Sequence, residues 1–168
     1  MNSDILHPLC QAIQERMLSR GLTLSTAESC TGGGMAAALT SVDGSSGYFQ
    51  GGLVAYQNEL KERFLGVSEA DILRYDVVSR PVAEQMVRGA CALFHTHCAI
   101  ASTGYTGQGN GPIPQGTVWI AWGTGTEVHS VCLRGNEGRE ANAARAVAAA
   151  LRHFKLWLEE KDSQCVMP

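Results

Sequence analysis

The segment LTLSTAESCTGGGMAAAL, residues 22–39, places a strand, a glycine turn and the start of a helix in immediate succession. Residues 22–27 combine apolar and β-branched side chains, which is typical of a buried strand. Glycines at 32–34 mark a turn, and the alanine-rich residues 35–39 favour a helix. Because a strand that turns directly into a helix is the repeating unit of α/β folds, this segment predicts an α/β protein.

The flanking sequence supplies helices and strands that alternate along the chain. Apolar residues recur every four positions from Ile5 to Met17, which predicts a helix ending near Gly21. We expect a short helix that Asn58 caps and that carries Lys61, and further helices over 69–74, after a Ser79 cap and over 139–158. We expect strands over 51–56, 97–102, 117–122 and 127–133. The last two strands resemble a hairpin at a sheet edge. This order predicts a single-domain, three-layer α/β/α sandwich with a mixed sheet.

Composition limits the classes of function. The 168 residues suit one domain, which we place at 1–160, followed by a frayed tail at 161–168. A net charge of -3 with scattered basic residues argues against a nucleic-acid partner, and no apolar stretch is long enough to cross a membrane. We therefore expect a cytoplasmic protein. With only 17% charged residues, the surface also favours a homodimer or a higher homo-oligomer.

The cysteines favour buried free thiols over disulfides or a metal site. The chain has 6 cysteines at irregular spacing, with no CxxC pair. His95, His97 and Cys98 carry side-chain types that bind zinc. However, alternating residues at the start of a strand point to opposite faces, and the sequence offers no second ligand pair. We expect no metal and no cofactor.

The glycine turn itself is a candidate anion site. A helix that begins directly after a strand presents free backbone N–H groups and the positive end of its dipole. Ser29 and Thr31 would add hydroxyl donors beside Gly32 and Gly33. The pattern is neither a Walker motif nor the dinucleotide fingerprint, and close packing of the helix on the strand explains the glycines equally well.

Ser46, Tyr56 and Lys61 form a candidate set for nucleophilic catalysis. A lysine that stays neutral near pH 7 can remove the proton of a serine hydroxyl. Short-chain dehydrogenases also use serine, tyrosine and lysine, but they need three residues between the last two, and here four intervene. From the residues alone, a solvated helix lysine and an ordinary strand tyrosine remain the alternative.

Two further features could bind a ligand. Arg139 opens the last predicted helix, and arginine matches phosphate or carboxylate geometry, although a surface charge is the simpler interpretation. The segment 103–116 is rich in glycine and proline and is long for a connecting loop, which is typical of functional loops.

A family resemblance runs through these motifs. The chain resembles the C-terminal domain family of the competence/damage-inducible protein CinA, whose stand-alone members are nicotinamide-nucleotide amidohydrolases. The matching motifs are TAESCTGG at 26–33, GSS at 44–46, YQNELK at 56–61, LGV at 65–67, VS at 78–79, VAEQM at 82–86, STG at 102–104, GTVW at 116–119, and Arg139.

The resemblance implies a fold, a reaction and roles for particular residues. It implies an α/β/α sandwich, often dimeric, that converts nicotinamide mononucleotide to nicotinate mononucleotide and ammonia without a metal. By motif, Ser46 would be the nucleophile, Lys61 its base and Tyr56 the residue that orients them. The residues that would hold the nucleotide are Ser29, Thr31, Gly32, Gly33, Ser45, Thr103, Gly104 and Arg139.

This chain departs from the family pattern on the substrate-binding side. In the family, Ile-Ala precedes the second glycine of the 104–116 loop, a proline follows that glycine, and Lys-Pro-Val-Gly closes a slightly longer loop. This chain instead has Gln108 after Gly107 and Gln115-Gly116 at the close of the loop, so a basic residue that could face the nucleotide is absent. It also has Asn142, Ala143 and Ala144 where the family tends to place arginines. A different substrate, or a nucleotide-binding or regulatory paralogue without turnover, is therefore the alternative to an active amidohydrolase.

Overall fold

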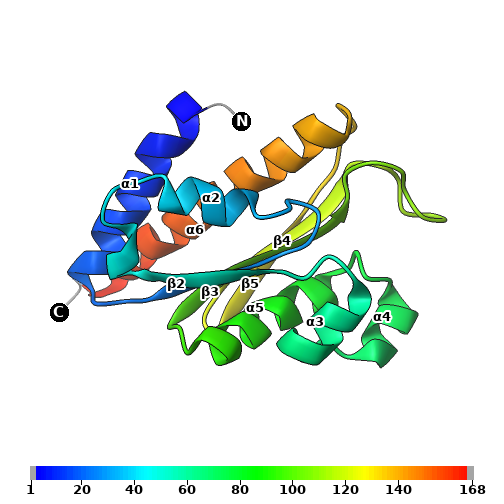
Figure 1. Cartoon of the computed structure of the whole chain (residues 1–168), viewed down its shortest axis with the longest axis horizontal. Helices are drawn as coiled ribbons and strands as arrows, with labels where there is room; N and C mark the ends of the chain where they lie inside the picture. The colour runs from blue at the N-terminus through cyan, green and yellow to red at the C-terminus, as the bar shows by residue number, and fades with distance from the viewer. Residues whose placement is uncertain (1–2, 166–168) are drawn as a thin grey trace.

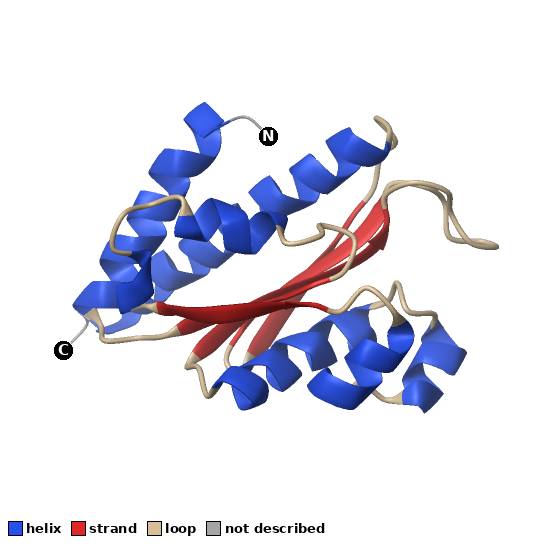
Figure 2. Cartoon of the chain, viewed as in Figure 1, coloured by secondary structure: helices blue, strands red, loops and turns tan. Residues whose placement is uncertain are grey.

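The computed structural model describes residues 3–165 and forms three layers, with helices on both faces of a five-stranded sheet (Figure 1; Figure 2). The strand order is β2-β1-β3-β4-β5. The strands are β1 Leu24–Glu28, β2 Phe49–Val54, β3 Cys98–Tyr105, β4 Thr117–Gly123 and β5 Val128–Leu133. The first three are parallel, and the β4–β5 hairpin continues the sheet antiparallel. The predicted α/β/α sandwich with a mixed sheet is confirmed.

Helices cover the two faces in separate groups. One group comprises α1 Ser3–Ser19, α2 Gly34–Thr40 and α6 Arg139–Cys165; the other comprises α3 Asn58–Leu65, α4 Glu69–Tyr75 and α5 Arg80–Phe94. Figure 1 shows them on opposite sides of the sheet. Each layer buries its own apolar cluster, with Ile13, Leu39 and Phe154 in the first and Val82, Met86 and Ala90 in the second. The apolar periodicity of the sequence therefore located the helices correctly.

Helix caps differ from the prediction. Gln57 occupies the N-cap position of α3, so Asn58 is the first helical residue and its side chain makes no capping bond. Ser79 does occupy the N-cap of α5, yet its hydroxyl forms no capping bond either. The backbone at Gln57 and at Ser79 is extended. The change from extended to helical backbone therefore sets where α3 and α5 begin, without a hydrogen bond from a capping side chain.

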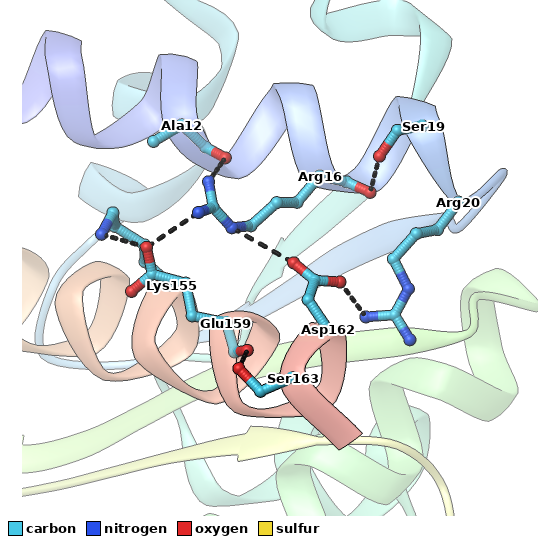
Figure 3. Close-up of polar contacts among 8 residues, drawn as sticks. All are labelled: Ala12, Arg16, Ser19, Arg20, Lys155, Glu159, Asp162 and Ser163. Atoms are coloured by element: carbon cyan, nitrogen blue, oxygen red, sulfur yellow. Dashed lines mark hydrogen bonds and ion pairs between the residues drawn. The ribbon is translucent and has the colours of Figure 1, made fainter. Parts of the chain in front are cut away.

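The last helix extends to Cys165, whereas we expected a frayed tail from residue 161. Ion pairs between α1 and α6 explain the difference (Figure 3). Arg16 contacts Glu159 at 2.8 Å and Asp162 at 3.5 Å, and Arg20 contacts Asp162 at 3.4 Å. Single surface pairs contribute little, but a network of them can hold the end of a helix. Residues 166–168 of the predicted tail lie outside the described residues.

Within residues 3–165, no helix combines the length and the apolar character needed to cross a bilayer.

Candidate functional site

A cavity of about 240 Å³ opens at the carboxyl ends of the parallel strands, where ligands of open α/β sheets ordinarily bind. It lies between the ends of β1 and β3, the start of α3, and the loop after β3. Its lining residues are Ser29, Cys30, Tyr56, Asn58, Lys61, Val77, Val78, Thr103, Gly104, Tyr105, Thr106, Gly107, Gln108 and Arg139. Six of the predicted site residues therefore share one cavity: Ser29, Tyr56, Lys61, Thr103, Gly104 and Arg139.

Lys61 is the buried cation of this cavity. Its side chain is only 1% exposed, and its ammonium donates to the backbone carbonyls of Ala55 at 2.7 Å and Tyr56 at 3.1 Å. No carboxylate is paired with it among the described residues. Burial lowers the pKa of Lys61 to about 8, because the charged form loses its hydration. A measurable fraction of this lysine is therefore neutral near pH 7.

Ser29 and Cys30 bring two potential nucleophiles to the same cavity, immediately after β1. Burial raises the pKa of the Cys30 thiol to about 12, so the thiol is not ionised near pH 7 and is a poor nucleophile. The Ser29 hydroxyl makes no hydrogen bond to any part of the chain that the structure describes, while its backbone N–H donates to Ser102. Ser29 therefore brings a hydroxyl without an internal hydrogen bond to the cavity that Lys61 also lines.

Tyr56 and Arg139 meet at the mouth of the cavity. Arg139 Nη2 donates to the Tyr56 hydroxyl at 2.6 Å, although the two residues are 83 positions apart in sequence. Both side chains are exposed, and the Arg139 guanidinium also approaches Gly107, where a Cβ would lie 3.1 Å from Nη1. Arg139 therefore contacts both Tyr56, just after β2, and Gly107, in the β3–β4 loop. It presents a fixed positive charge to an entering ligand.

The predicted anion site at the glycine turn is occupied by the protein itself. The Glu28 carboxylate accepts from the backbone N–H groups of Gly33, Met35 and Ala36 at 2.8–3.1 Å and from the Thr31 hydroxyl at 2.7 Å. These are the donors that a phosphate would need. Thr31 and Gly33 therefore hold the turn closed and do not face the cavity.

Gly32 has the same structural role. Its backbone N–H donates to the Ser29 carbonyl, and its φ of 61° lies in the left-handed region that favours glycine. Neither Gly32 nor its neighbours Thr31 and Gly33 line the cavity. The nucleotide-binding role that the resemblance implied for these three residues is not supported by their geometry.

The end of β3 forms one wall of the cavity. The Thr103 hydroxyl donates to the Val77 carbonyl at 2.9 Å, and a Cβ at Gly104 would lie 2.6 Å from Val118. Gly104 is required by this close packing of β3 on β4. We had predicted an irregular segment from residue 103, but β3 continues to Tyr105 because β4 supplies backbone partners as far as Thr117.

Ser45 and Ser46 lie elsewhere. They belong to a short 3-10 turn, Ser45–Gly47, that precedes β2, whereas Tyr56 and Lys61 follow β2. The six residues of β2 separate the Ser45–Gly47 turn from Tyr56 and Lys61 by roughly 20 Å. Within one chain, the structure therefore does not bring the predicted nucleophile Ser46 to its predicted base Lys61.

The sequence missed the residues that hold the loop over the cavity. Asp76 accepts from the Tyr105 hydroxyl at 3.0 Å and from the Asn110 amide at 3.2 Å, which fixes the loop after β3 against the segment between α4 and α5. Asp76 has a φ of 71°, unusual for a residue other than glycine. Asn58 and Gln108 also line the cavity, although the sequence marks Asn58 only as a helix cap and Gln108 only as a departure from the family loop. In the sequence, Asp76 and Asn110 carry no signal beyond their polar character.

The alternative zinc site is explained by ordinary contacts. His97 Nδ1 lies 2.8 Å from the Thr23 hydroxyl, His95 closes the end of α5, and Cys98 is buried in β3. Across residues 3–165, no group of three or more His, Cys, Asp or Glu side chains is placed to hold a metal ion.

Comparison with known proteins places these features in a family. Residues 6–158 match the model of the CinA C-terminal domain. The chain is 43% identical over 150 residues to the nicotinamide-nucleotide amidohydrolase PncC of Pseudomonas putida, covering 88% of this chain and 94% of that protein. It is 41% identical to a protein of the same name from Shewanella oneidensis, covering 88% of this chain but 35% of that longer protein.

Solved structures agree in fold and in sequence. A CinA superfamily protein from Klebsiella pneumoniae matches with a TM-score of 0.88 and 32% identity, covering 92% of this chain and 98% of that one. A CinA superfamily protein from Escherichia coli matches with a TM-score of 0.87 and 33% identity, covering 94% of this chain and 92% of that one. The family model covers most of the chain, and the chain therefore belongs to the CinA C-terminal domain family.

Proposed function

We propose that this chain is a nicotinamide-nucleotide amidohydrolase that converts nicotinamide mononucleotide to nicotinate mononucleotide and ammonia. The single observation that carries the proposal is the buried, unpaired Lys61, whose lowered pKa suits a base, in one cavity with the Ser29 hydroxyl. The names of the relatives from Pseudomonas putida and Shewanella oneidensis supply the substrate.

The charge of the cavity fits an anionic substrate. Lys61 and Arg139 are the charged residues among those that line it, and no aspartate or glutamate does so. Arg139 stands at the exposed mouth, where the phosphate of a nucleotide can remain partly hydrated, while Lys61 lies in the interior. We assign phosphate recognition to Arg139 and recognition of the carboxamide end to the region around Lys61.

In the proposed reaction, the acyl group of the substrate is transferred to Ser29 and then to water. Neutral Lys61 takes the proton of the Ser29 hydroxyl as its oxygen attacks the carboxamide carbon, which gives a tetrahedral oxyanion. The resulting ammonium returns the proton to the departing nitrogen, and ammonia leaves. Water, deprotonated by Lys61, then hydrolyses the ester and releases the carboxylate product. Tyr56, fixed by Arg139, borders the path of the substrate.

Ser29 takes the nucleophile's role in this proposal because its position within one chain favours it over Ser46. Ser29 lines the cavity with Lys61, whereas Ser46 lies at the opposite end of β2. Ser29→Ala should reduce ammonia release from nicotinamide mononucleotide by a factor of about 10³ or more, since removal of the nucleophile leaves only binding and electrostatic catalysis. Coupled detection of ammonia measures this rate.

A matched variant gives the control. Ser68→Ala replaces a serine at the N-cap of α4, away from the cavity, and should leave turnover close to that of the unchanged chain. Near-normal turnover of a folded Ser29→Ala variant would move the nucleophile elsewhere. If the unchanged chain gives a thermal shift with the nucleotide but no ammonia, the chain is a binding or regulatory paralogue and the proposed activity is wrong.

A further inference from the structure

Asp76 lies behind the wall of the cavity and connects that wall to the loop after β3. One oxygen of its carboxylate accepts from the Val78 N–H at 2.8 Å and from the Tyr105 hydroxyl at 3.0 Å, and the other accepts from the Asn110 amide at 3.2 Å. Val78 and Tyr105 line the cavity, whereas the other two residues do not. The carboxylate therefore fixes two cavity-lining segments from outside the cavity.

The backbone of Asp76 has a conformation that favours glycine. Its φ of 71° and ψ of 154° lie in a region that residues with a Cβ rarely adopt. A glycine would end α4 here without this strain, but it would leave the Tyr105 hydroxyl and the Asn110 amide without the carboxylate. What the aspartate adds over a glycine at this position is therefore its contact with the loop.

Side chains of α6 anchor the two ends of the loop after β3. The Asn142 amide donates to the Thr106 carbonyl at 2.9 Å, and Arg145 donates to the Gly116 carbonyl at 3.0 Å. These contacts fix the loop where it leaves β3 and where it enters β4. The middle of the loop extends beyond the ends of both strands (Figure 1), and Asp76 hydrogen-bonds it from the opposite side, next to α4.

The middle of the loop borders the residue to which we assigned the phosphate. Gly107 and Gln108 line the cavity together with Arg139. A Cβ at Gly107 would lie 3.1 Å from Arg139 Nη1, so the loop packs directly on the guanidinium. A loop that moved away would take Gln108 from the cavity and leave the guanidinium without this neighbour. The shape of the binding site therefore depends on where the loop is held.

We propose that Asp76 is a positioning residue for substrate binding: its carboxylate holds the loop after β3 against Arg139, so that affinity for the nucleotide depends on a side chain that does not touch it. The identity of the nucleotide rests on the proposed function. Because the bound substrate and the transition state share the contacts with the loop, loss of the carboxylate raises KM and leaves kcat nearly unchanged.

Two variants at position 76 separate the carboxylate from the backbone. Asp76→Gly and Asp76→Ala both remove the carboxylate, but only the alanine keeps the Cβ that strains the backbone. Both should raise KM for nicotinamide mononucleotide about tenfold, with kcat within about twofold. Asp76→Gly should unfold at least about 2 °C above Asp76→Ala. A normal KM in Asp76→Gly would overturn the proposal, because the backbone conformation alone would then explain the residue.

A double variant tests the path from the carboxylate to the loop. Asn110 does not line the cavity, so Asn110→Ala should raise KM about threefold by loosening the loop alone. The KM of Asp76→Gly/Asn110→Ala should match that of Asp76→Gly, since the second change removes a hydrogen bond that is already lost. Effects of the two changes that multiply would show that they act independently and would contradict this path.

A conservative variant and a control complete the series. Asp76→Asn keeps one side-chain oxygen that can accept from the Tyr105 hydroxyl, so its KM should stay within about threefold of that of the unchanged chain. Glu69→Ala removes an exposed carboxylate at the start of α4 and should leave KM unchanged. A KM that rises equally in Glu69→Ala and Asp76→Gly would assign the effect to the charge of α4 and not to the loop.

Hydrogen exchange reports on the loop without a ligand. The backbone amides of residues 106–116 should exchange faster in Asp76→Gly than in the unchanged chain, and Glu69→Ala should not change their rates. Equal exchange rates in Asp76→Gly and the unchanged chain would contradict the hold that we assign to the carboxylate.

Calorimetric titration with nicotinamide mononucleotide separates this inference from the proposed function. If the unchanged chain binds the nucleotide but releases no ammonia, the proposed function fails, and a Kd about tenfold weaker in Asp76→Gly still supports the positioning role. Equal Kd values for these two chains would overturn that role, whether or not ammonia is released. An unchanged chain that does not bind the nucleotide would overturn both.

Discussion

Two buried charged residues, each 1% exposed, lie at the ends of neighbouring strands: Glu28 is the last residue of β1, and Lys61 donates to Ala55, directly after β2. Their surroundings differ. Glu28 receives hydrogen bonds from three backbone N–H groups and from Thr31, so its charge is compensated by the start of α2. Lys61 has two carbonyl oxygens and no carboxylate partner in the described part of the chain. The first charge stabilises the fold, and the second is available for chemistry.

The difference shows how a buried ionisable group acquires a role. A charge that is fully hydrogen-bonded keeps its ionised form and holds its donors in place. A charge that is buried with few partners is shifted toward its neutral form, as the lowered pKa of Lys61 indicates. Burial alone therefore does not distinguish a structural group from a catalytic one; the number and charge of its partners do.

The largest expected effect comes from removal of the compensated charge. Glu28→Ala leaves the N–H groups of Gly33, Met35 and Ala36 without an acceptor, so we expect a loss of about 3–5 kcal/mol in the free energy of unfolding. Urea denaturation measures it. Glu15→Ala, at an exposed position on α1, is the control and should change the free energy by less than about 0.5 kcal/mol. Equal effects of the two variants would contradict the role assigned to Glu28.

The next effect concerns the pH dependence of the proposed reaction. The neutral form of Lys61 is the base, and its pKa is lowered to about 8. We therefore expect kcat/KM to rise about tenfold per pH unit below pH 8 and to level off above it. Steady-state rates of ammonia release between pH 6 and 9 give the profile. A rate that is independent of pH across this range would exclude Lys61 as the base.

The smallest effect is a gain in stability when the uncompensated charge is removed. Burial lowers the pKa of Lys61 to about 8 from its ordinary value of 10.5, so this burial costs stability below pH 8, and the cost disappears as pH rises toward 10.5. Lys61→Met should raise the free energy of unfolding by about 1–2 kcal/mol at pH 7, after the lost hydrogen bonds are counted, and by less at pH 10. The partly exposed Lys161→Met is the control. A destabilised Lys61→Met at pH 7 would show that the lysine is compensated.

The sequence by itself determined the secondary structure and the fold class of this protein. Hydrophobic period, glycine turns and alanine content are local properties of the chain, and they located the strand at residues 24–28, the helix that follows it and the terminal helices. The motif around Tyr56 and Lys61 was equally local, because only the start of α3 separates the two residues. Their common cavity followed directly from the chain path.

Only the tertiary structure decided which groups meet across the sheet. Glu28 and the glycine turn both stand in the sequence, but whether the helix start binds an external anion or its own carboxylate depends on the direction of one side chain. Arg139 reaches Tyr56 because α6 begins beside the end of β2. Ser46 and Lys61 belong to two successive motifs of the sequence, yet they lie beyond opposite ends of β2, since an extended strand of six residues carries its two ends apart.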